Sequence, residues 1–289
     1  VLDRRLPRAL RELLLDPQAE LDATSVTQPV LVAFSLALTA QWRAWGVAPD
    51  WVAGHSLGEF SAAQAAGCCA LDALLELVAE RGRLMQDLPA GAMAAVFAPP
   101  ARVAALLADL GGAAWVAADN GPDDAVIAGP PAAVARALRL AVVEGLEVRP
   151  LPVAFAAHGP AVATSLDGLA AASARVAWRA PRCGWVSTRT GASQVAPPDA
   201  AHWRGHTRDP VRFGAALTAL RAQRVEFMLE LGPGASLARL AGRALPEVGV
   251  ASSVAGDDDP AEHVLGVATR LWDLGVPIAW EQLHADVSL

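Results

Sequence analysis

The sequence predicts an α/β protein with a larger part, built on a parallel sheet, into which a small α+β part is inserted. Three patterns in the 289 residues support this prediction. Short apolar runs alternate with segments of helical period, a glycine-flanked serine follows one of those runs, and the rhythm changes near residue 91. We find no repeat and no low-complexity tract, which argues against a solenoid or an array of linkers.

The first ninety residues read as helix, strand, turn and helix. Apolar residues recur at helical spacing over residues 29–45. Residues 51–53 form a short apolar run that suits a buried strand. The small-residue segment 60–67 and the amphipathic segment 71–85 predict two further helices.

From residue 91 the pattern becomes strand, helix, strand, helix, strand. The expected strands are 93–97, 125–128 and 148–153, and the expected helices are 100–107 and 131–140. Pro150 and Pro152 make the last of these strands an edge strand, because proline cannot donate to a ladder. This pattern predicts an inserted α+β subdomain over residues 92–154.

The remaining sequence returns to the larger part. Residues 225–231 predict a buried strand capped by Gly232-Pro233-Gly234, with a helix from Ala235, and a helix over 260–274 precedes a short closing strand at 278–280. The predicted organisation has three parts: a large part of residues 1–91 and 155–255, a small part of residues 92–154, and a C-terminal helix with linker of residues 256–289.

Composition excludes several functional classes. With 54% hydrophobic and 18% charged residues the chain can bury a full core, and its net charge of -7 argues against a nucleic-acid surface. No stretch reaches the ~18 to 20 apolar residues of a membrane span, and the start lacks the pattern of a signal peptide, so we expect a cytoplasmic protein. Cys68, Cys69 and Cys183 offer neither a disulfide framework nor the spacing of metal ligands, so no metal is expected.

The strongest local motif is Gly54-His55-Ser56-Leu57-Gly58, which fits the G-x-S-x-G nucleophile elbow. The elbow places Ser56 on a sharp turn between strand and helix, with both glycines expected because side chains there would collide. The backbone N–H of Leu57, at the start of the helix, is placed to bind an oxyanion. A chance match in a chain rich in alanine and glycine is the alternative, and the strand before and helix after the motif weaken it.

A general base must come from one of six histidines. His55 is adjacent to the nucleophile, but on a turn its side chain points away, which favours a structural role. His158 follows the apolar run 151–157 where the chain re-enters the larger part. On the residues alone His158 is the first among several candidates.

Ordered motifs along nearly the whole chain resemble the acyltransferase domain of modular type I polyketide synthases, related to malonyl-CoA:acyl carrier protein transacylases. The motifs are Thr27-Gln28-Pro29, residues 54–59, Arg81-Gly82-Arg83-Leu84-Met85-Gln86, residues 91–96, Asn120-Gly121-Pro122, His158, Pro210-Val211-Arg212-Phe213 and Glu230-Leu231-Gly232-Pro233. The resemblance implies a large α/β-hydrolase-like subdomain and a small ferredoxin-like one. It also implies acyl transfer from CoA to the phosphopantetheine thiol of an acyl carrier protein in polyketide biosynthesis, beside neighbouring synthase domains, with no bound cofactor.

The resemblance also implies roles for individual residues. Ser56 is the nucleophile and His158 its general base, without a carboxylate as third member. His206, four residues before Pro210, falls where the family places the residue whose backbone carbonyl orients the base. Arg81 matches the arginine that pairs with the free carboxylate of a malonyl-type acyl group, which a guanidinium can bind through two hydrogen bonds. The alternative of a surface arginine is outweighed by the family-like residues that follow it.

Further residues are expected near the acyl group: Gln28, His55, Asn120, Phe155 and Ala157. Gln28 and Asn120 could equally be ordinary turn or cap residues. The selectivity motif of the family reads Phe155-Ala156-Ala157-His158 here, whereas malonyl-selective domains usually have His-Ala-Phe-His and methylmalonyl-selective ones Tyr-Ala-Ser-His. Ala157 should leave room for a methyl group, but Leu57 and residues 24–28 look malonyl-like. The balance favours malonyl slightly, with methylmalonyl or another small C2-substituted malonyl open.

Two departures and two rival functions complete the predictions. The family's Gly-Gln-Gly strand-end motif, whose glutamine amide completes the oxyanion hole, is missing from Val1 onward, so the chain is a fragment or lacks that segment. The tail 271–283 resembles the linker that follows acyltransferase domains. An editing thioesterase with the same Ser–His site and a silent structural or docking domain remain alternatives. A basic face for an acidic carrier is visible only at Arg204, Arg208 and Arg212, where a solvated face is the alternative.

Overall fold

The computed structural model describes residues 1–254, 256 and 259–287 and is a mixed α/β fold. Its helices are η1 (Leu2–Arg4), α1 (Leu10–Leu15), α2 (Thr24–Ala44), α3 (Gly58–Ala65), α4 (Leu71–Gln86), α5 (Pro100–Ala108), α6 (Pro131–Val143), η2 (Pro160–Ser165), α7 (Leu166–Ser173), α8 (Ala200–Arg208), α9 (Phe213–Ala222), α10 (Ser236–Ala244), α11 (Pro260–Asp273) and α12 (Trp280–Asp286). Its strands are β1 (Trp51–Ala53), β2 (Ala92–Phe97), β3 (Trp115–Gly121), β4 (Asp124–Gly129), β5 (Glu147–Pro150), β6 (Gly184–Ser187), β7 (Ala192–Ser193), β8 (Val211–Arg212), β9 (Phe227–Glu230) and β10 (Gly249–Ser252).

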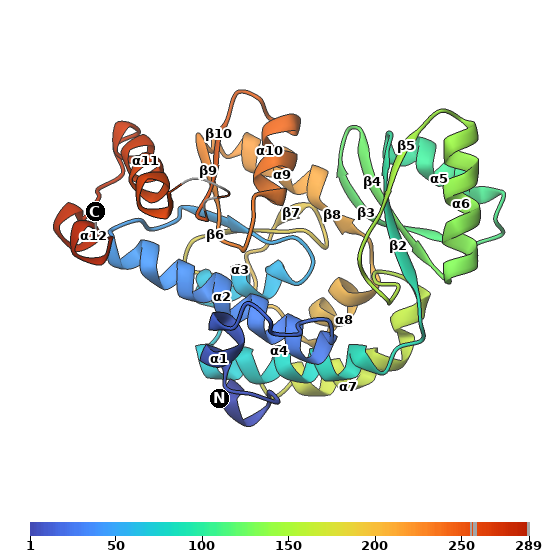
Figure 1. Cartoon of the computed structure of the whole chain (residues 1–289), viewed down its shortest axis with the longest axis horizontal. Coiled ribbons are helices and arrows are strands. Elements are labelled where there is room, and N and C mark those ends of the chain that lie inside the picture. The colour runs from blue at the N-terminus through green and yellow to red at the C-terminus, as the bar shows by residue number, and fades with distance from the viewer. Residues whose placement is uncertain (255, 257–258, 288–289) are drawn as a thin grey trace.

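The largest sheet has the strand order β5-β2-β4-β3-β8, and α5 and α6 cover one of its faces (Figure 1). Along the chain the order is β2, α5, β3, β4, α6, β5, so the insertion carries a β-α-β-β-α-β unit. Strand β5 lies at the edge, as predicted, but it ends at Pro150, so Pro152 lies outside it. The expected pattern lacked β3, because the polar pair Asp119 and Asn120 interrupts its apolar run.

Strand β8 links the two parts of the molecule. It pairs in parallel with β3, with Val211 opposite Ala118 and Arg212 opposite Asp119. The face of the sheet opposite α5 and α6 packs on α9 and α10, which come from the later part of the chain. The inserted sheet therefore extends beyond residue 154 into the segment that follows α8.

The remaining strands form two small sheets. Strands β1 and β6 pair in parallel and β7 adds an antiparallel edge, while β9 and β10 pair in parallel in a sheet of their own. Among the described residues these pairs do not join into the single parallel sheet that we expected. The sheet of the larger part was thus predicted as too regular, although β1 pairs in parallel with β6.

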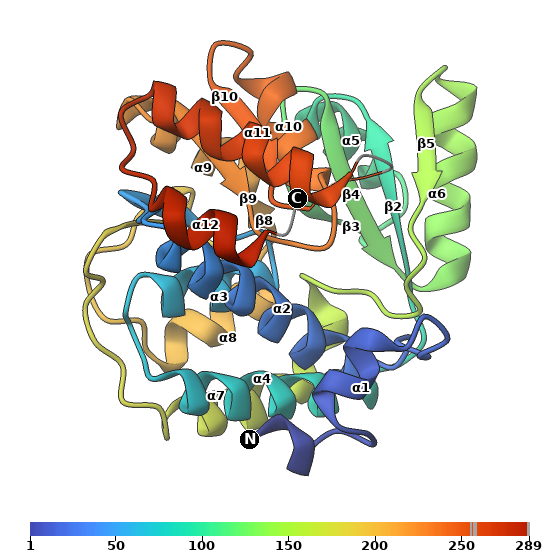
Figure 2. The same cartoon turned by 60° about the vertical axis from the view of Figure 1, so that its left-hand side comes forward.

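The C-terminal segment corrects another prediction. The expected strand 278–280 is absent from the described residues, and α12 begins at Trp280 instead. Ile278 is buried among apolar residues of α2, α11 and α12, and the N–H of Ala279 donates to the carbonyl of Trp45 at the end of α2 (Figure 2). The apolar run reflects helix packing. The predicted boundary between residues 255 and 256 touches residue 255, which lies outside the described residues.

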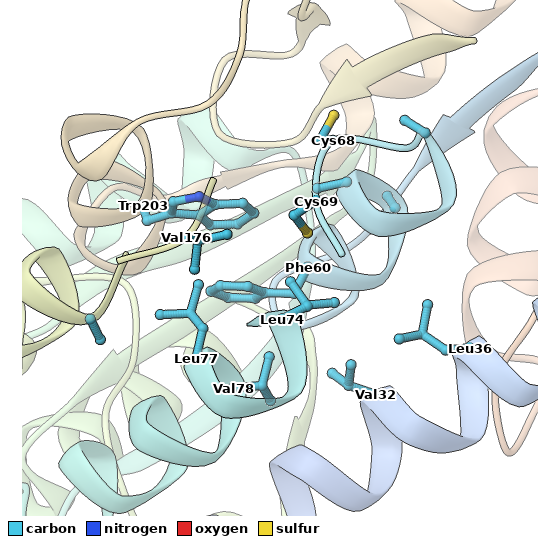
Figure 3. Packing of buried hydrophobic residues seen from close by; sticks show 14 of the residues in the cluster. Val32, Leu36, Phe60, Cys68, Cys69, Leu74, Leu77, Val78, Val176 and Trp203 are labelled. Carbon is cyan, nitrogen blue, oxygen red and sulfur yellow. The ribbon is translucent and has the colours of Figure 1, made fainter. Parts of the chain in front are cut away.

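A buried cluster of helices supports the helix that follows Ser56. Phe60 of α3 is fully buried and stacks on Trp203 of α8, with ring centroids 4.1 Å apart (Figure 3). Side chains of α2 and α4, including Val32 and Leu74, complete the cluster. Burial of such large rings holds α3 against α8. Cys68 and Cys69 line the same cluster as small apolar residues.

Helix α2 begins five residues earlier than predicted. Proline favours the first turn of a helix, so Pro29 suggested a start, but the helix begins at Thr24 and includes Pro29. The hydroxyl of Thr27 donates to the carbonyl of Ala23 at 3.0 Å in the first turn. No helix in the described ranges combines the length and the apolar character that crossing a membrane requires.

Candidate active site

Ser56 lies on the turn that joins β1 to α3. Its φ of +50° is in the left-handed region, which few residues other than glycine adopt. A Cβ on Gly54 would lie 2.1 Å from the carbonyl oxygen of Gly58, whereas a Cβ on Gly58 would meet nothing within 4 Å. The predicted collision is therefore correct for Gly54 and wrong for Gly58. The turn exposes the Ser56 side chain at the end of β1.

His158 is the hydrogen-bonding partner of Ser56. Its Nε2 lies 2.7 Å from Oγ of Ser56, and its Nδ1 lies 3.1 Å from the backbone carbonyl oxygen of Asp209. A carbonyl oxygen can only accept, so the proton is on Nδ1 and Nε2 has a free lone pair. The Ser56 hydroxyl therefore donates to Nε2. This is the hydrogen bond that a general base requires before it takes the serine proton.

The residue that orients His158 differs from the prediction. We expected the backbone carbonyl of His206, but the carbonyl belongs to Asp209, the C-cap residue of α8. The carbonyl of Asp209 is available because this residue lies beyond the last turn of the helix, in extended conformation. Its side chain is held by Arg189, whose Nε lies 3.4 Å from Oδ2.

His206 has another contact with the nucleophile. Its Nε2–H donates to the backbone carbonyl of Ser56 at 2.9 Å, and its Nδ1 is buried without a partner among the described residues. Burial lowers the pKa of His206 to about 4, although the nearby carboxylate of Glu59 opposes the shift. The neutral imidazole is favoured because a proton on Nδ1 would be buried without an acceptor.

Burial also favours the neutral form of His158. It lowers the pKa of His158 to about 3, and the proximity of His206 and of the Arg81 charge adds to this effect. The carbonyl of Asp209 opposes the shift. At neutral pH the imidazole is therefore unprotonated and ready to accept the proton of Ser56.

Glu59, to which the sequence motifs assigned no role, lies in a buried polar cluster close to Ser56 in the chain. It is fully buried on the first turn of α3 and accepts hydrogen bonds from the Ser187 hydroxyl, from the Thr188 N–H at 2.9 Å and from His202 Nε2 at 3.1 Å. Burial alone would raise the pKa of this carboxyl, but the hydrogen bond from His202 and the nearby imidazoles hold it at about 2. Glu59 is therefore an anion that ties α3 to β6 and α8.

Arg81 is a buried cation that has no acidic partner within the part of the chain that the structure describes. Only 3% of its surface is exposed, one guanidinium nitrogen donates to Oε1 of Gln28, and Nε has no partner among the described residues. Burial lowers its pKa to about 10, so it remains charged at neutral pH. A buried charge is costly unless it is paired. The described residues supply no carboxylate to pair with this charge, so an anionic ligand is the partner that it lacks. Gln28 also contacts Met85, with Nε2 3.4 Å from the sulfur.

His55 and Asn120 meet across the two parts of the chain. His55 Nε2–H donates to Oδ1 of Asn120 at 2.8 Å, and the amide of Asn120 donates to Asp124 at 2.9 Å. The ring of His55 also packs edge-on against Phe213. These two contacts support a structural role for His55. The same hydrogen bond joins the turn of the nucleophile to strand β3.

Three predicted residues remain: Leu57, Phe155 and Ala157. Leu57 is the N-cap of α3, where helix N–H groups lack intrahelical partners and can bind an anion. Phe155 forms an isolated bridge with Ala90, and Ala157 is buried immediately before His158. The described residues contain no cluster of three side chains suited to hold a metal ion.

Residues 8–270 match the family model described as acyl transferase domain. The chain belongs to this family. It is 39% identical over 291 aligned residues to Pks1 of Mycobacterium tuberculosis, a phenolphthiocerol synthesis polyketide synthase type I whose name carries the word "inactive". The match covers 98% of this chain and 18% of that protein. The domain therefore corresponds to a small part of a much longer relative.

Solved structures agree with this assignment. The acyltransferase domain from the second module of the salinomycin polyketide synthase superposes with a TM-score of 0.90 at 37% identity, covering 99% of this chain and 70% of that one. The malonyl CoA-acyl carrier protein transacylase of Coxiella burnetii gives 0.82 at 29% identity, covering 93% and 87%. The predicted resemblance to polyketide synthase acyltransferase domains is confirmed, as is the enzyme class of this family, acyl-CoA:acyl carrier protein S-acyltransferase.

Proposed function

We propose that this domain transfers a malonyl-type acyl group from CoA to the phosphopantetheine thiol of an acyl carrier protein, through an acyl ester on Ser56. The observation that carries the proposal is the buried, charged Arg81, for which the described residues supply no acidic partner. Its charge contributes to the low pKa of His158 in the same site. A substrate carboxylate would supply the missing anion, and a planar guanidinium binds a carboxylate through two hydrogen bonds.

In the first half-reaction Ser56 Oγ attacks the thioester carbonyl of the acyl-CoA while His158 Nε2 takes its proton. The protonated imidazole is stabilised by the Asp209 carbonyl, which accepts from Nδ1. The N–H of Leu57 stabilises the oxyanion. The C–S bond then breaks, and the CoA thiolate takes the proton from Nε2. The result is an acyl ester on Ser56 and a neutral base.

The second half-reaction repeats these steps with a different nucleophile. His158 takes the proton of the phosphopantetheine thiol, and the thiolate attacks the acyl ester. The tetrahedral intermediate collapses, the C–O bond to Ser56 breaks, and Oγ recovers the proton from Nε2. No cofactor takes part, because both steps exchange an acyl group and a proton. The acceptor is an acyl carrier protein, either beside neighbouring synthase domains or separate from them.

The acyl group is most consistent with malonyl or a small C2-substituted malonyl such as methylmalonyl. Arg81 accounts for the free carboxylate. Ala157 is small and buried beside the base, which favours space at the α-carbon. A methyl group in an apolar pocket changes binding by only ~1 to 3 kcal/mol, so acceptance of both substrates is compatible with the site.

The architecture supports a two-part catalytic unit. We assign residues 1–91 and 155–255 to an α/β-hydrolase-like subdomain and residues 92–154 to a ferredoxin-like one, with residues 256–289 as C-terminal helix and linker. The β-α-β-β-α-β order of the insertion supports this division.

The expected basic face for a carrier protein is largely neutralised by ion pairs: Arg204 pairs with Asp167, and Arg208 pairs with Asp209 at 3.0 Å.

Two alternative functions compete with acyl transfer to a carrier protein. An editing thioesterase would release the acyl group of Ser56 to water, and a silent docking domain would not form the ester. The mycobacterial relative whose name carries the word "inactive" gives the silent domain a specific basis. Against it, Ser56 and His158 are at hydrogen-bonding distance here.

The test is intact-mass detection of acyl-Ser56 after incubation with malonyl-CoA, methylmalonyl-CoA and acetyl-CoA in competition. We expect the malonyl adduct to dominate over acetyl and the Ser56→Ala variant to take up neither. Arg81→Ala should reduce the preference for malonyl over acetyl by about 100-fold or more, because a desolvated charge pair is lost. Arg83→Ala is the matched control, since Arg83 on the same helix is exposed and pairs with Glu80.

An unchanged preference in Arg81→Ala would contradict the role of the guanidinium. Addition of a phosphopantetheinylated carrier protein separates the remaining alternatives. Transfer to its thiol should exceed release to water. Release that exceeds transfer supports the thioesterase, and a wild-type domain that forms no adduct supports the silent domain.

A further inference from the structure

Strand β3 brings a tryptophan to the backbone of the catalytic loop. Trp115, its first residue, is partly buried, and its indole Nε1–H donates to the carbonyl oxygen of Ala157 at 3.1 Å. That carbonyl belongs to the peptide bond that joins Ala157 to His158. The indole therefore fixes the plane of the Ala157–His158 peptide bond, which contains the backbone nitrogen of His158.

The same indole occupies the space beside the residue that follows the base. A Cβ added to Gly159 would lie 2.1 Å from Nε1 of Trp115 and 2.2 Å from Cε2. Real Cβ atoms do not approach other atoms so closely, so no side chain fits at this position while the indole stays where it is. Gly159 has a φ of -178°, which any residue can adopt. The glycine is required by the space that Trp115 fills and not by its backbone angles.

These contacts surround a strained residue. His158 has a φ of +52°, in the left-handed region, and such a conformation persists only where the surroundings determine it. The Asp209 carbonyl holds the ring from the other side, at the entrance to β8, which pairs with β3. Strand β3 thus holds the backbone before His158, through Trp115. Its neighbour β8 follows Asp209, whose carbonyl accepts from Nδ1 of His158.

We propose that Trp115 is a positioning residue for the base: its N–H holds the Ala157 carbonyl, and its ring excludes a side chain at Gly159, so that His158 Nε2 stays aligned with Ser56. This inference rests on the proposed function, in which His158 is the general base. It assigns to the inserted subdomain a role in positioning the base for acyl transfer. Trp115 does not touch the reacting atoms and acts through the 157–159 backbone.

Trp115→Phe tests the hydrogen bond with little change in packing. The variant keeps an aromatic ring and loses the N–H, which leaves the Ala157 carbonyl without this donor. We expect the single-turnover rate of Ser56 acylation by malonyl-CoA to fall about 3- to 10-fold, with the KM for malonyl-CoA unchanged. Trp272→Phe is the matched control, because Trp272 is 51% exposed on α11. Thermal unfolding of both variants separates a loss of alignment from a loss of folded protein.

A double-mutant cycle tests the space that the indole fills. Gly159→Ala alone should displace Trp115 and slow acylation about 100-fold, as expected when a catalytic group moves by about 1 Å. In a Trp115→Ala background the same substitution should change the rate less than about 3-fold, because the clash no longer exists. If the two single effects simply multiply in the double variant, the proposal is wrong.

Diisopropyl fluorophosphate provides a readout that does not depend on the acyl substrate. It phosphorylates an activated serine, with loss of fluoride and with the serine proton taken by the base. Wild-type labelling with no malonyl adduct would overturn the malonyl assignment and leave the positioning role to be decided by the labelling rate of Trp115→Phe. A rate equal to wild type in folded Trp115→Phe would overturn the positioning role, and a 3- to 10-fold lower rate would support it. Absence of labelling in the wild type would overturn both.

Discussion

His206 Nε2 donates a hydrogen bond to the backbone carbonyl oxygen of Ser56 at 2.9 Å, and the N–H of Glu59 donates to the same oxygen at 2.9 Å. Two donors thus hold the backbone carbonyl of Ser56, a residue whose φ is in the left-handed region. One donor belongs to the first turn of α3 and the other to α8. The conformation of the elbow therefore depends on a side chain 150 residues further along the chain.

Removal of the side-chain donor should loosen the nucleophile. In His206→Phe the Ser56 carbonyl loses one of its two donors, and we expect a loss of about 1 kcal/mol in the free energy of unfolding and about 10-fold in the acylation rate. His206→Gln places an amide N–H near the position of Nε2 and should recover most of the rate. Denaturant unfolding and single-turnover acylation measure the two effects. Equal rates in His206→Phe and wild type would show that the α3 donor suffices.

The pH dependence of acylation should show an unusually acidic base. Burial lowers the pKa of His158 to about 3, so the neutral form persists well below the ordinary histidine value of 6.5. We expect kcat/KM for acyl-CoA to stay flat as pH falls from 7.5 to about 5, where an ordinary histidine would lose more than 10-fold. Stopped-flow mixing with a brief acid pulse limits unfolding during the measurement. An inflection near pH 6.5 would show that His158 is more solvated than its contacts indicate.

The sequence predicts local geometry best where the information is local. The elbow around Ser56 is a continuous motif with a strand before it and a helix after it, and both elements form. Arg81 and Gln28 were separate motifs, and the structure brings them into contact. These predictions needed only the order of the motifs and the type of each side chain.

The errors concern geometry that distant segments decide. Which backbone carbonyl contacts His158 depends on where α8 ends. The position of a helix end is uncertain by one or two residues, so the sequence could not separate His206 from Asp209. Strand β3 was missed because its pairing with β8 joins segments about ninety residues apart and its own apolar run is broken. Trp115 could not be assigned a role without that strand.

Acid should destabilise the domain, because burial and local contacts lower the pKa values of four buried groups: Glu59, His55, His158 and His206. The pKa of Glu59 is held at about 2 against an ordinary 4.5, so its stabilisation is present above pH 4.5 and lost as pH falls from 4.5 to 2. The pKa values of His158 and His206 are also lowered, to about 3 and 4. Unfolded histidines bind protons from pH 6.5 downward while the folded ones do not. The free energy of unfolding should therefore fall continuously below pH 6.5.

The contribution of Glu59 can be separated with Glu59→Gln. The neutral amide cannot replace an anion that accepts from Ser187, Thr188 and His202, so we expect a loss of about 2 to 4 kcal/mol at pH 7. The variant should also lose the part of the acid slope between pH 4.5 and 2. Urea unfolding of both proteins across this range measures the slope. Parallel pH profiles for the two proteins would mean that Glu59 is not the group that titrates.

The width of the acyl site at the α-carbon can be tested at Ala157. This residue is 6% exposed and precedes the base, so a larger side chain there would extend into the space beside the acyl ester if the site lies as proposed. In Ala157→Phe we expect kcat/KM for methylmalonyl-CoA to fall about 10- to 100-fold relative to malonyl-CoA, as is usual for one methyl group in an apolar pocket. Ala154→Phe, at an exposed position of the same segment, is the control. The thermal unfolding temperature shows whether the phenylalanine is accommodated. A folded Ala157→Phe domain with an unchanged substrate ratio would place the α-substituent away from Ala157, because the phenyl ring would then occupy space that the acyl group does not use.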